Sequence, residues 1–199
     1  MNSITRMWLT WAHARKFARL GAHCRFPVPS LEVRGHVEIG DHCRFRDNVT
    51  LHARPGARIV FGNRSGCSWG CLLDASAEIR VGNYVGVAEH VIVCDAVLPL
   101  MGHGACWRGV AAEARPVALG DNCFIGSACI IGPGVTVGEG AVIAHHSVVL
   151  RDVPPYEIWA GAPARRVSHR TEGLSEEKLR EAREMIARHG LQRDRYLDE

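Results

Sequence analysis

Eight cysteines and eleven histidines are the side chains of this sequence best suited to bind a metal ion or to act as nucleophiles and bases. The only close cysteine pair, Cys67 and Cys71, has the spacing C-x3-C, and no second pair stands at zinc-finger distance. A disulfide framework is not expected in a 199-residue chain that we expect to be cytoplasmic. The cysteines therefore predict neither disulfides nor a metal site.

One histidine lies in a segment that interrupts an otherwise regular sequence. His103 stands between two glycines in "LPLMGHGACWRGVAAEARPVA", residues 98–118, and Trp107 and Arg108 follow it. Long irregular segments in compact domains usually carry function. We therefore expect this segment to contribute to a functional site.

The sequence on both sides of this segment repeats every six residues. One series of inward positions is aliphatic, and a second series, four residues further on, is small or branched. The first runs through Leu119, Ile125, Ile131, Val137, Ile143 and Val149, and the second through Cys123, Cys129, Val135, Ala141, Ser147 and Val153. The same two series recur upstream from Ile39 to Val97. A hexapeptide period predicts a β-helix in which three hexads close one triangular coil.

This repeat also assigns a packing role to most of the cysteines. Five of them occupy inward positions, where cysteine serves as a small apolar side chain; they are Cys43, Cys67, Cys71, Cys123 and Cys129. Short insertions at 57–60 and 79–80 are expected to lengthen corners. A β-sandwich is the alternative fold, but its strands alternate with period two and its turns come every 8–12 residues.

Both ends of the chain are expected to be helical. Residues 1–22 place apolar side chains on one stripe of an amphipathic helix, and Ser175 is a plausible N-cap for a second helix within 171–199. We expect the N-terminal helix to cap the open end of a β-helix domain at 23–170. Its basic, apolar character keeps contact with a membrane surface open as the alternative.

Composition narrows the classes of function. The chain is 47% hydrophobic and 23% charged, which is typical of a globular protein, and its net charge of +3 is too small to indicate nucleic-acid binding. Residues 1–21 lack the apolar region of a signal peptide, and no apolar stretch is long enough to span a bilayer. We therefore expect a cytoplasmic protein.

Two stretches resemble the hexapeptide-repeat acyltransferases, and most of all their galactoside, maltose and polysaccharide O-acetyltransferase branch. They are "VALGDNCFIGSACIIGPGVTVGEGAVIAHHSVVLRDVPPYEIWAGAPARRV" and, more weakly, "ARIVFGNRSGCSWGCLLDASAEIRVGNYVGVAEHVIV". The resemblance implies a left-handed parallel β-helix, a homotrimer and acyl-coenzyme A bound between subunits. It implies transfer of acetyl from acetyl-CoA to a saccharide hydroxyl, as in a surface polysaccharide or lipopolysaccharide precursor.

The resemblance also implies roles for individual residues. His103 is the expected general base, with His90 as the alternative, and Asp95 is expected to orient the base beside the acceptor. Trp69 and Trp107 are expected to contact the acceptor. The coenzyme A groove is expected to use Gly126, Ser127, His145, Arg151, Arg165 and Arg166. Two of these residues have an alternative interpretation. His145 could instead form a surface-exposed pair with His146, and Arg151 could instead pair with Asp152 or Glu157.

Three other functions remain open. The first is N-acylation of an amino sugar, which would use the same base. The second is a zinc-dependent carbonic anhydrase on the same type of coil, although His36, His42 and His52 lack the spacing that a three-histidine zinc site needs. The third is a trimeric scaffold without catalytic activity. The acceptor and the acyl chain length are not determined by the sequence.

Overall fold

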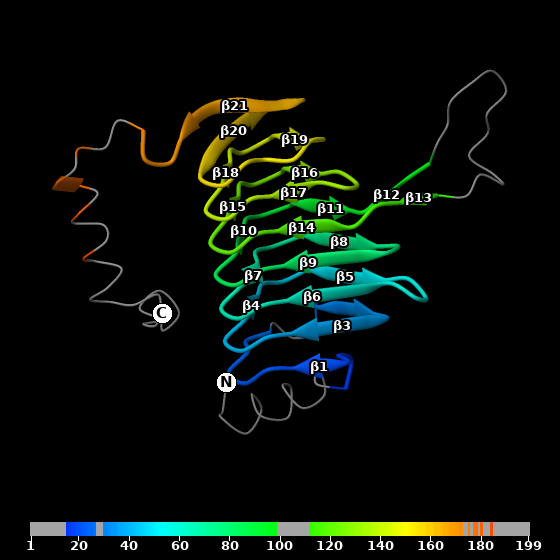
Figure 1. Cartoon of the computed structure of the whole chain (residues 1–199). Helices are drawn as coiled ribbons and strands as arrows, with labels where there is room; N and C mark the ends of the chain where they lie inside the picture. Colours follow the sequence, from blue (N-terminus) through cyan, green and yellow to red (C-terminus); the bar gives the residue numbers. More distant parts are fainter. Residues whose placement is uncertain are drawn as a thin grey trace, which may run out of the picture.

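The computed structural model describes residues 15–26, 30–98 and 112–172, together with residues 175, 177, 178, 180 and 184. These residues form a parallel β-helix, a stack of triangular coils that runs the length of the molecule (Figure 1). The hexapeptide prediction of an all-β fold is therefore confirmed.

Three parallel sheets form the sides of the prism. Sheet A contains β1 (Arg19–Leu20), β3 (His36–Ile39), β6 (Arg58–Phe61), β9 (Glu78–Val81), β14 (Val117–Leu119) and β17 (Thr136–Val137). Sheet B contains β4 (Arg44–Phe45), β7 (Gly66–Cys67), β10 (Gly86–Val87), β15 (Phe124–Ile125), β18 (Val142–Ile143) and β20 (Glu157–Gly161), and ends with antiparallel β21 (Ala164–His169). Sheet C contains β2 (Glu32–Arg34), β5 (Thr50–Ala53), β8 (Leu72–Ala75), β11 (Ile92–Cys94), β16 (Ile130–Ile131) and β19 (Val148–Val149).

The aliphatic series of the sequence forms the core of this prism. Residues six apart lie on successive sides, so residues eighteen apart pair in register between neighbouring coils, as Ile125 does with Ile143 and Ile131 with Val149. All four are fully buried. Each coil therefore buries its apolar face against the next, and the hydrophobic effect holds the stack together.

The second, small-residue series closes the corners. Cys43, Cys71 and Cys129 donate their thiols to the carbonyl oxygens of Gly62, Ala88 and Ala144 in the adjacent coil, at 3.0, 2.9 and 3.0 Å. The five cysteines predicted to pack inward are buried and free of disulfides. Their packing role is confirmed.

The structure differs from the sequence prediction in two places. The insertions at 57–60 and 79–80 lie largely within strands β6 and β9, so they lengthen sheet A rather than its corners. The β-helix also begins earlier than expected. Strand β1, which lies inside the segment 1–22 that was predicted to be helical, pairs with β3.

The chain ends are described only in part. Residues 1–14 lie outside the described structure, as does most of 171–199. Within the C-terminal segment, Lys178 donates its backbone N–H to the Ser175 hydroxyl at 3.3 Å, which is the hydrogen bond expected of an N-cap. Among the described residues, no helix is long and apolar enough to cross a bilayer.

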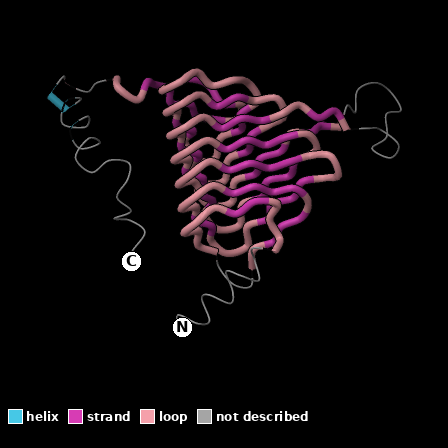
Figure 2. Tube along the Cα trace, turned by 60° about the horizontal axis from the view of Figure 1, so that its bottom comes forward, coloured by secondary structure: helices cyan, strands magenta, loops and turns pink. Residues whose placement is uncertain are grey.

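The irregular segment leaves the prism at the corner between sheets C and A. Its two ends, β12 (Ala96–Val97) and β13 (Glu113–Ala114), pair as an antiparallel stem. Residues 99–111, which include His103 and Trp107, lie outside the described structure. In a triangular prism the corner between sheets C and A is opposite sheet B, and the stem accordingly projects on the side away from β4, β7 and β10 (Figure 1). Figure 2 also shows a pair of strands leaving the side of the stack.

Asp95 fixes the corner from which this stem emerges. Its side chain is fully buried, and its two carboxylate oxygens accept the backbone N–H groups of Ser76 and Ala77 at 2.6 and 2.8 Å. The backbone N–H of Arg115 donates to the Asp95 carbonyl at 2.6 Å, which ties the far side of the stem to the same residue. Asp95 thus joins two coils to the base of the stem.

We predict that Asp95→Ala lowers the free energy of unfolding by about 2–3 kcal/mol, because two buried backbone donors lose their acceptor. Asp95→Asn keeps one acceptor oxygen, so its free energy of unfolding should lie between those of Asp95→Ala and the wild type. Asp152→Ala is the control, since Asp152 is exposed and accepts one backbone N–H, from Thr136. Urea unfolding measures all three, and equal losses for Asp95→Ala and Asp152→Ala would contradict the bracing role.

Candidate functional site

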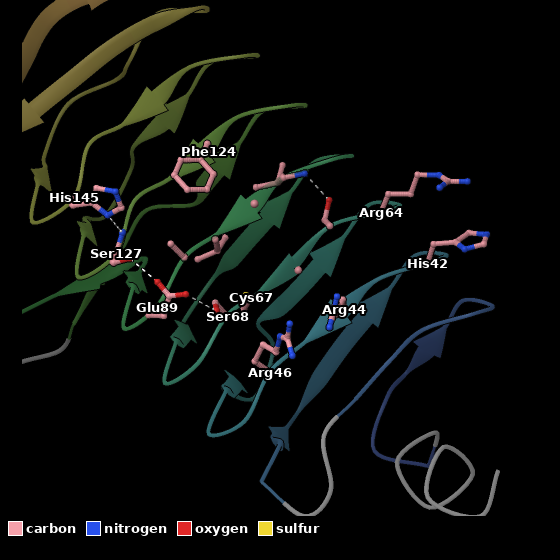
Figure 3. Close-up of a pocket in the computed structure, with 16 residues that line it drawn as sticks. His42, Arg44, Arg46, Arg64, Cys67, Ser68, Glu89, Phe124, Ser127 and His145 are labelled. Atoms are coloured by element: carbon pink, nitrogen blue, oxygen red, sulfur yellow. Dashed lines mark hydrogen bonds between the residues drawn. The ribbon is translucent and has the colours of Figure 1, made fainter. Parts of the chain in front are cut away.

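A groove of about 440 Å³ lies on the outer face of sheet B (Figure 3). Its floor exists because the outward positions of two neighbouring strands, β7 and β10, are glycines, Gly66 and Gly86, which pair in register. A Cβ at Gly66 would lie 1.8 Å from the carbonyl oxygen of Arg44, and one at Gly86 would lie 3.1 Å from the Phe124 ring. The hollow therefore depends on the absence of side chains at these positions.

One wall of the groove is a chain of hydrogen bonds along the corner between sheets B and C. Ser68 and Ser127 donate their hydroxyls to the two carboxylate oxygens of Glu89, at 2.8 and 2.6 Å. The backbone N–H of Ser127 donates to Nδ1 of His145 at 2.9 Å. Residues from four successive coils are thereby linked into one wall.

The coil geometry places these side chains in a column. Glu89, Ser127 and His145 occupy the same corner position of successive coils, and the residue after each has a positive φ near 57°. The hydrogen bond from Ser127 makes Nδ1 of His145 an acceptor. Neutral His145 therefore carries its proton on Nε2.

Hydrogen bonding lowers the pKa of Glu89 to about 2. The Ser127 hydroxyl is the largest cause, followed by the residue's own backbone N–H and by Ser68, and the nearby His145 contributes less. Glu89 is consequently ionised at neutral pH and is a weak base. An ionised carboxylate only accepts hydrogen bonds, and Glu89 accepts one from each of the two serines.

The opposite end of the groove, toward the N-terminal coils, is basic. It is lined by His42, Arg44, Arg46 and Arg64. The Arg46 guanidinium lies over the Trp69 ring, 4.9 Å from its centre, which is a cation–π contact. Trp69 is 43% exposed and stands beside this basic end.

The structure brings together part of the predicted site. Ser127 and His145 both line the groove. Gly126, the residue before Ser127, has no room for a side chain, since a Cβ there would lie 2.7 Å from the backbone nitrogen of His145. Trp69 is next to the basic end, through Arg46. Asp95 is not among these residues, because its buried carboxylate is fully occupied by the corner that it braces.

The three arginines expected to bind coenzyme A lie outside this groove. Arg151 is exposed after β19 and has no ion-pair partner among the described residues, while Asp152 and Glu157 are engaged with Thr136 and Arg166. Arg165 donates to the Ala164 carbonyl, and Arg166 pairs with Glu157 at 3.2 Å on the hairpin β20–β21. Neither residue is near the hollow of β7 and β10.

Neither of the two histidines expected as the general base is among the described residues that line the groove. His103 lies outside the described residues, as does Trp107. His90 is exposed and does not line the groove; its ring lies over Gly70, where a Cβ would come within 2.4 Å of Nδ1. No group of three or more histidine, cysteine, aspartate or glutamate side chains able to hold a metal ion is found in the described part of the chain.

Sequence reasoning missed Glu89 and the basic end. Arg44 and Arg46 flank the inward Phe45, so strand alternation alone places both on the outer face. Glu89 was harder to find, since it meets Ser127 across the long irregular segment, 38 residues further along the chain.

We predict that Glu89 contributes an acid-sensitive part of the stability. Because its pKa in the folded protein, about 2, lies below the usual 4.5, this contribution is complete above pH 4.5 and is lost as the pH falls toward 2. The melting temperature of Glu89→Gln should therefore lie below that of the wild type at pH 6, and the two should converge by pH 2–3. Thermal unfolding across this range measures the gap, and a gap that does not change with pH would contradict the ionised pair of hydrogen bonds.

Comparison with known proteins supports the repeat and the fold. Residues 116–151 match the family described as bacterial transferase hexapeptide (six repeats). A probable acetyltransferase of Mycobacterium tuberculosis is 28% identical over 141 residues, which are 67% of this chain and 44% of that protein. The chain thus spans less than half the length of this curated relative.

Solved structures agree over most of the chain. AntD, an N-acyltransferase from Bacillus cereus in complex with dTDP and 3-hydroxybutyryl-CoA, superposes with a TM-score of 0.72 at 19% identity, covering 90% of this chain and 95% of AntD. A galactoside acetyltransferase in complex with coenzyme A gives a TM-score of 0.59 at 21% identity, covering 85% and 74%. This chain is therefore a hexapeptide-repeat β-helix protein, built on the fold that these acyltransferases share.

Proposed function

We propose that the protein is an acyl-CoA-dependent acyltransferase that moves acetyl from acetyl-CoA to a hydroxyl of a saccharide. The observation that carries this proposal is the pair Ser127 and His145, joined at 2.9 Å on the wall of a groove in sheet B. Both residues were expected to contact coenzyme A. The solved relatives that bind coenzyme A or an acyl-CoA support the same cofactor.

The reaction needs a base and an oxyanion donor. A sugar hydroxyl is a poor nucleophile near neutral pH, and an imidazole that removes its proton during attack on the thioester contributes roughly 10²–10⁴-fold. A backbone N–H stabilises the tetrahedral oxyanion, which then collapses and releases the coenzyme A thiolate. We assign the base to His103, and no covalent intermediate on the enzyme is required.

We place His103 at this groove by way of a second copy of the chain. The stem β12–β13 leaves the prism at the corner between sheets C and A, whereas Ser127 and His145 lie at the corner between sheets B and C, so the width of sheet C separates the two within one chain. We propose a homotrimer in which the loop of one subunit reaches the groove of the next. In this arrangement each site takes its base from a neighbour.

Sheet C provides a suitable face for such an assembly. Leu72, Ile92, Ile130 and Val148 stack in register on its outer face, and Ile92 and Ile130 are each 38% exposed. Sheet A instead presents ion pairs, such as Arg58 with Glu78 at 2.7 Å. Sheet B carries the groove. An apolar column on one side of the prism therefore favours sheet C as the contact between subunits.

N-acylation of an amino sugar is the second candidate. It is favoured by the likeness to AntD, an N-acyltransferase bound to dTDP. The ionised Glu89 carboxylate also suits a groove that receives a nitrogen-bearing acceptor, because it accepts hydrogen bonds from N–H donors. Acetyl-CoA turnover with matched sugars that carry a hydroxyl or an amino group at the same carbon distinguishes the two reactions.

We predict that acetyl-CoA raises the melting temperature of the wild type and that His103→Ala lowers kcat by about 10²–10⁴-fold while this stabilisation remains. Turnover falls because no base removes the proton of the acceptor hydroxyl. Acetyl-CoA still binds, because the wall formed by Ser127 and His145 is unchanged. Turnover of acetyl-CoA over a panel of sugars gives kcat, and thermal shift gives binding.

His90→Ala is the matched control for this variant, because His90 is an exposed histidine that does not line the groove, and its activity should stay near that of the wild type. Full activity in His103→Ala would reject the assignment of the base. Stabilisation by zinc alone, with none by acetyl-CoA, would reject the acyltransferase.

We predict that the double change Ile92→Glu and Ile130→Glu converts the trimer to monomers, since two charges per subunit would then be buried in the contact. Sedimentation velocity measures the mass of each species. The control pair is Val60→Glu and Ala118→Glu on the outer face of sheet A, which should leave the trimer intact. A wild type that sediments as a monomer would overturn the assembly.

A further inference from the structure

The basic end of the sheet B groove has no part in the acyl transfer described above. His42 and Arg64 come from the corner between sheets A and B, and Arg44 and Arg46 come from β4 and the residue after it (Figure 3). Glu89 is the only acidic side chain among the residues that line the groove, and it lies on the wall formed by Ser68 and Ser127. The lining therefore has a clear excess of positive charge.

These cations are packed close to one another. Arg25 pairs in register with Arg44 in the adjacent coil, and Arg46 follows Arg44 on the same outer face. Burial lowers the pKa of Arg44, and the charges of Arg46 and Arg25 lower it further. A group of like charges in one hollow is unfavourable by itself and is relieved when an anion binds among them.

Arg46 stands beside the exposed Trp69 ring, with its guanidinium 4.9 Å from the centre of that ring. A planar guanidinium presents its N–H groups as a fork that matches the oxygen atoms of a phosphate group. Three arginines and a histidine around one hollow therefore favour a ligand with several anionic oxygens.

The length of the groove separates this basic cluster from the end that carries Ser127 and His145. Arg44 lies on β4 and Phe124 on β15, three strands further along sheet B, a span of about 14 Å at the usual strand spacing. Ser127 and His145 are at the far end of this span. Phe124 is 42% exposed and offers a ring face between the two ends.

We propose that the basic end, defined by His42, Arg44, Arg46 and Arg64, binds a phosphate group of the acceptor, so that the acceptor is a phosphorylated saccharide rather than a neutral one. This inference rests on the proposed acyl transfer, because the acceptor is identified only by reference to that reaction. The phosphate lies at the N-terminal end of the groove and anchors the acceptor, while the acetylated group points toward Ser127 and His145.

Coenzyme A also carries phosphates, so the experiment separates the two sources. The probe is inorganic pyrophosphate, titrated by calorimetry into the full chain with and without saturating coenzyme A. Arg44→Gln, Arg46→Gln and Arg64→Gln are compared with Arg80→Gln, an exposed arginine of sheet A that pairs with Glu78. Thermal unfolding of every variant confirms that it is folded.

We expect pyrophosphate to bind the coenzyme A-saturated wild type. Each groove variant should weaken this binding by about 10- to 100-fold, because a charge-assisted hydrogen bond is lost, while Arg80→Gln binds as the wild type does. Affinity for coenzyme A should be unchanged in all four variants.

Three results would overturn the acceptor subsite. Coenzyme A that competes with pyrophosphate and binds weakly to the groove variants would assign the arginines to the cofactor. Equal pyrophosphate affinity in Arg46→Gln and Arg80→Gln would show that the probe binds elsewhere. Pyrophosphate binding without any binding of acetyl-CoA would overturn the acyl transfer, and with it the acceptor, but not the anion site.

Discussion

The stacking of each coil on its neighbours is the interaction on which the rest of this structure depends. No coil has a core of its own, and an inward side chain such as Ile125 is buried by Ile143 in the next coil. The backbone follows the same register, since Gly126 donates to the carbonyl of Ile143 at 2.8 Å. Any position that recurs once per coil is therefore placed directly above its counterpart.

This superposition turns the corners into columns, and the molecule uses two of them differently. At the corner between sheets A and B, Asn63 accepts the backbone N–H of Asp41, and Asp121 accepts that of Asn83, so that these side chains support the backbone of the coil before them. At the corner between sheets B and C, Ser127 likewise donates its backbone N–H to His145, but Glu89 accepts the side-chain hydroxyls of Ser68 and Ser127 along the groove. The same geometry thus supports the backbone on one edge of sheet B and forms the wall of the groove on the other.

The period predicted the core and the packing cysteines because every inward position repeats the same physical requirement. The resemblance assigned Ser127 and His145 to the same groove, and the period explains why they meet, since they are eighteen residues apart. Glu89 joins them only because the segment 98–118 leaves the prism and returns in phase, and a count along the sequence does not reveal that. Asp95 was expected near the acceptor because it lies beside that segment. In the structure its carboxylate instead accepts the backbone N–H groups of Ser76 and Ala77. Arg151, Arg165 and Arg166 were expected to bind coenzyme A from the resemblance, and they lie after β19 and on the hairpin β20–β21, away from β7 and β10.

The groove occurs where the repeat departs from what a β-helix needs. Outward glycines at Gly66 and Gly86 weaken two strands without serving the core, and Arg44 and Arg46 place like charges close together. Features that oppose stability and persist in a regular fold are expected at functional sites. The apolar column on sheet C is a departure of the same kind, because a face exposed to water has no need of Ile92 and Ile130. The hollow on sheet B, the stem at the opposite corner and the apolar column on sheet C are the three features that the proposed trimer brings together.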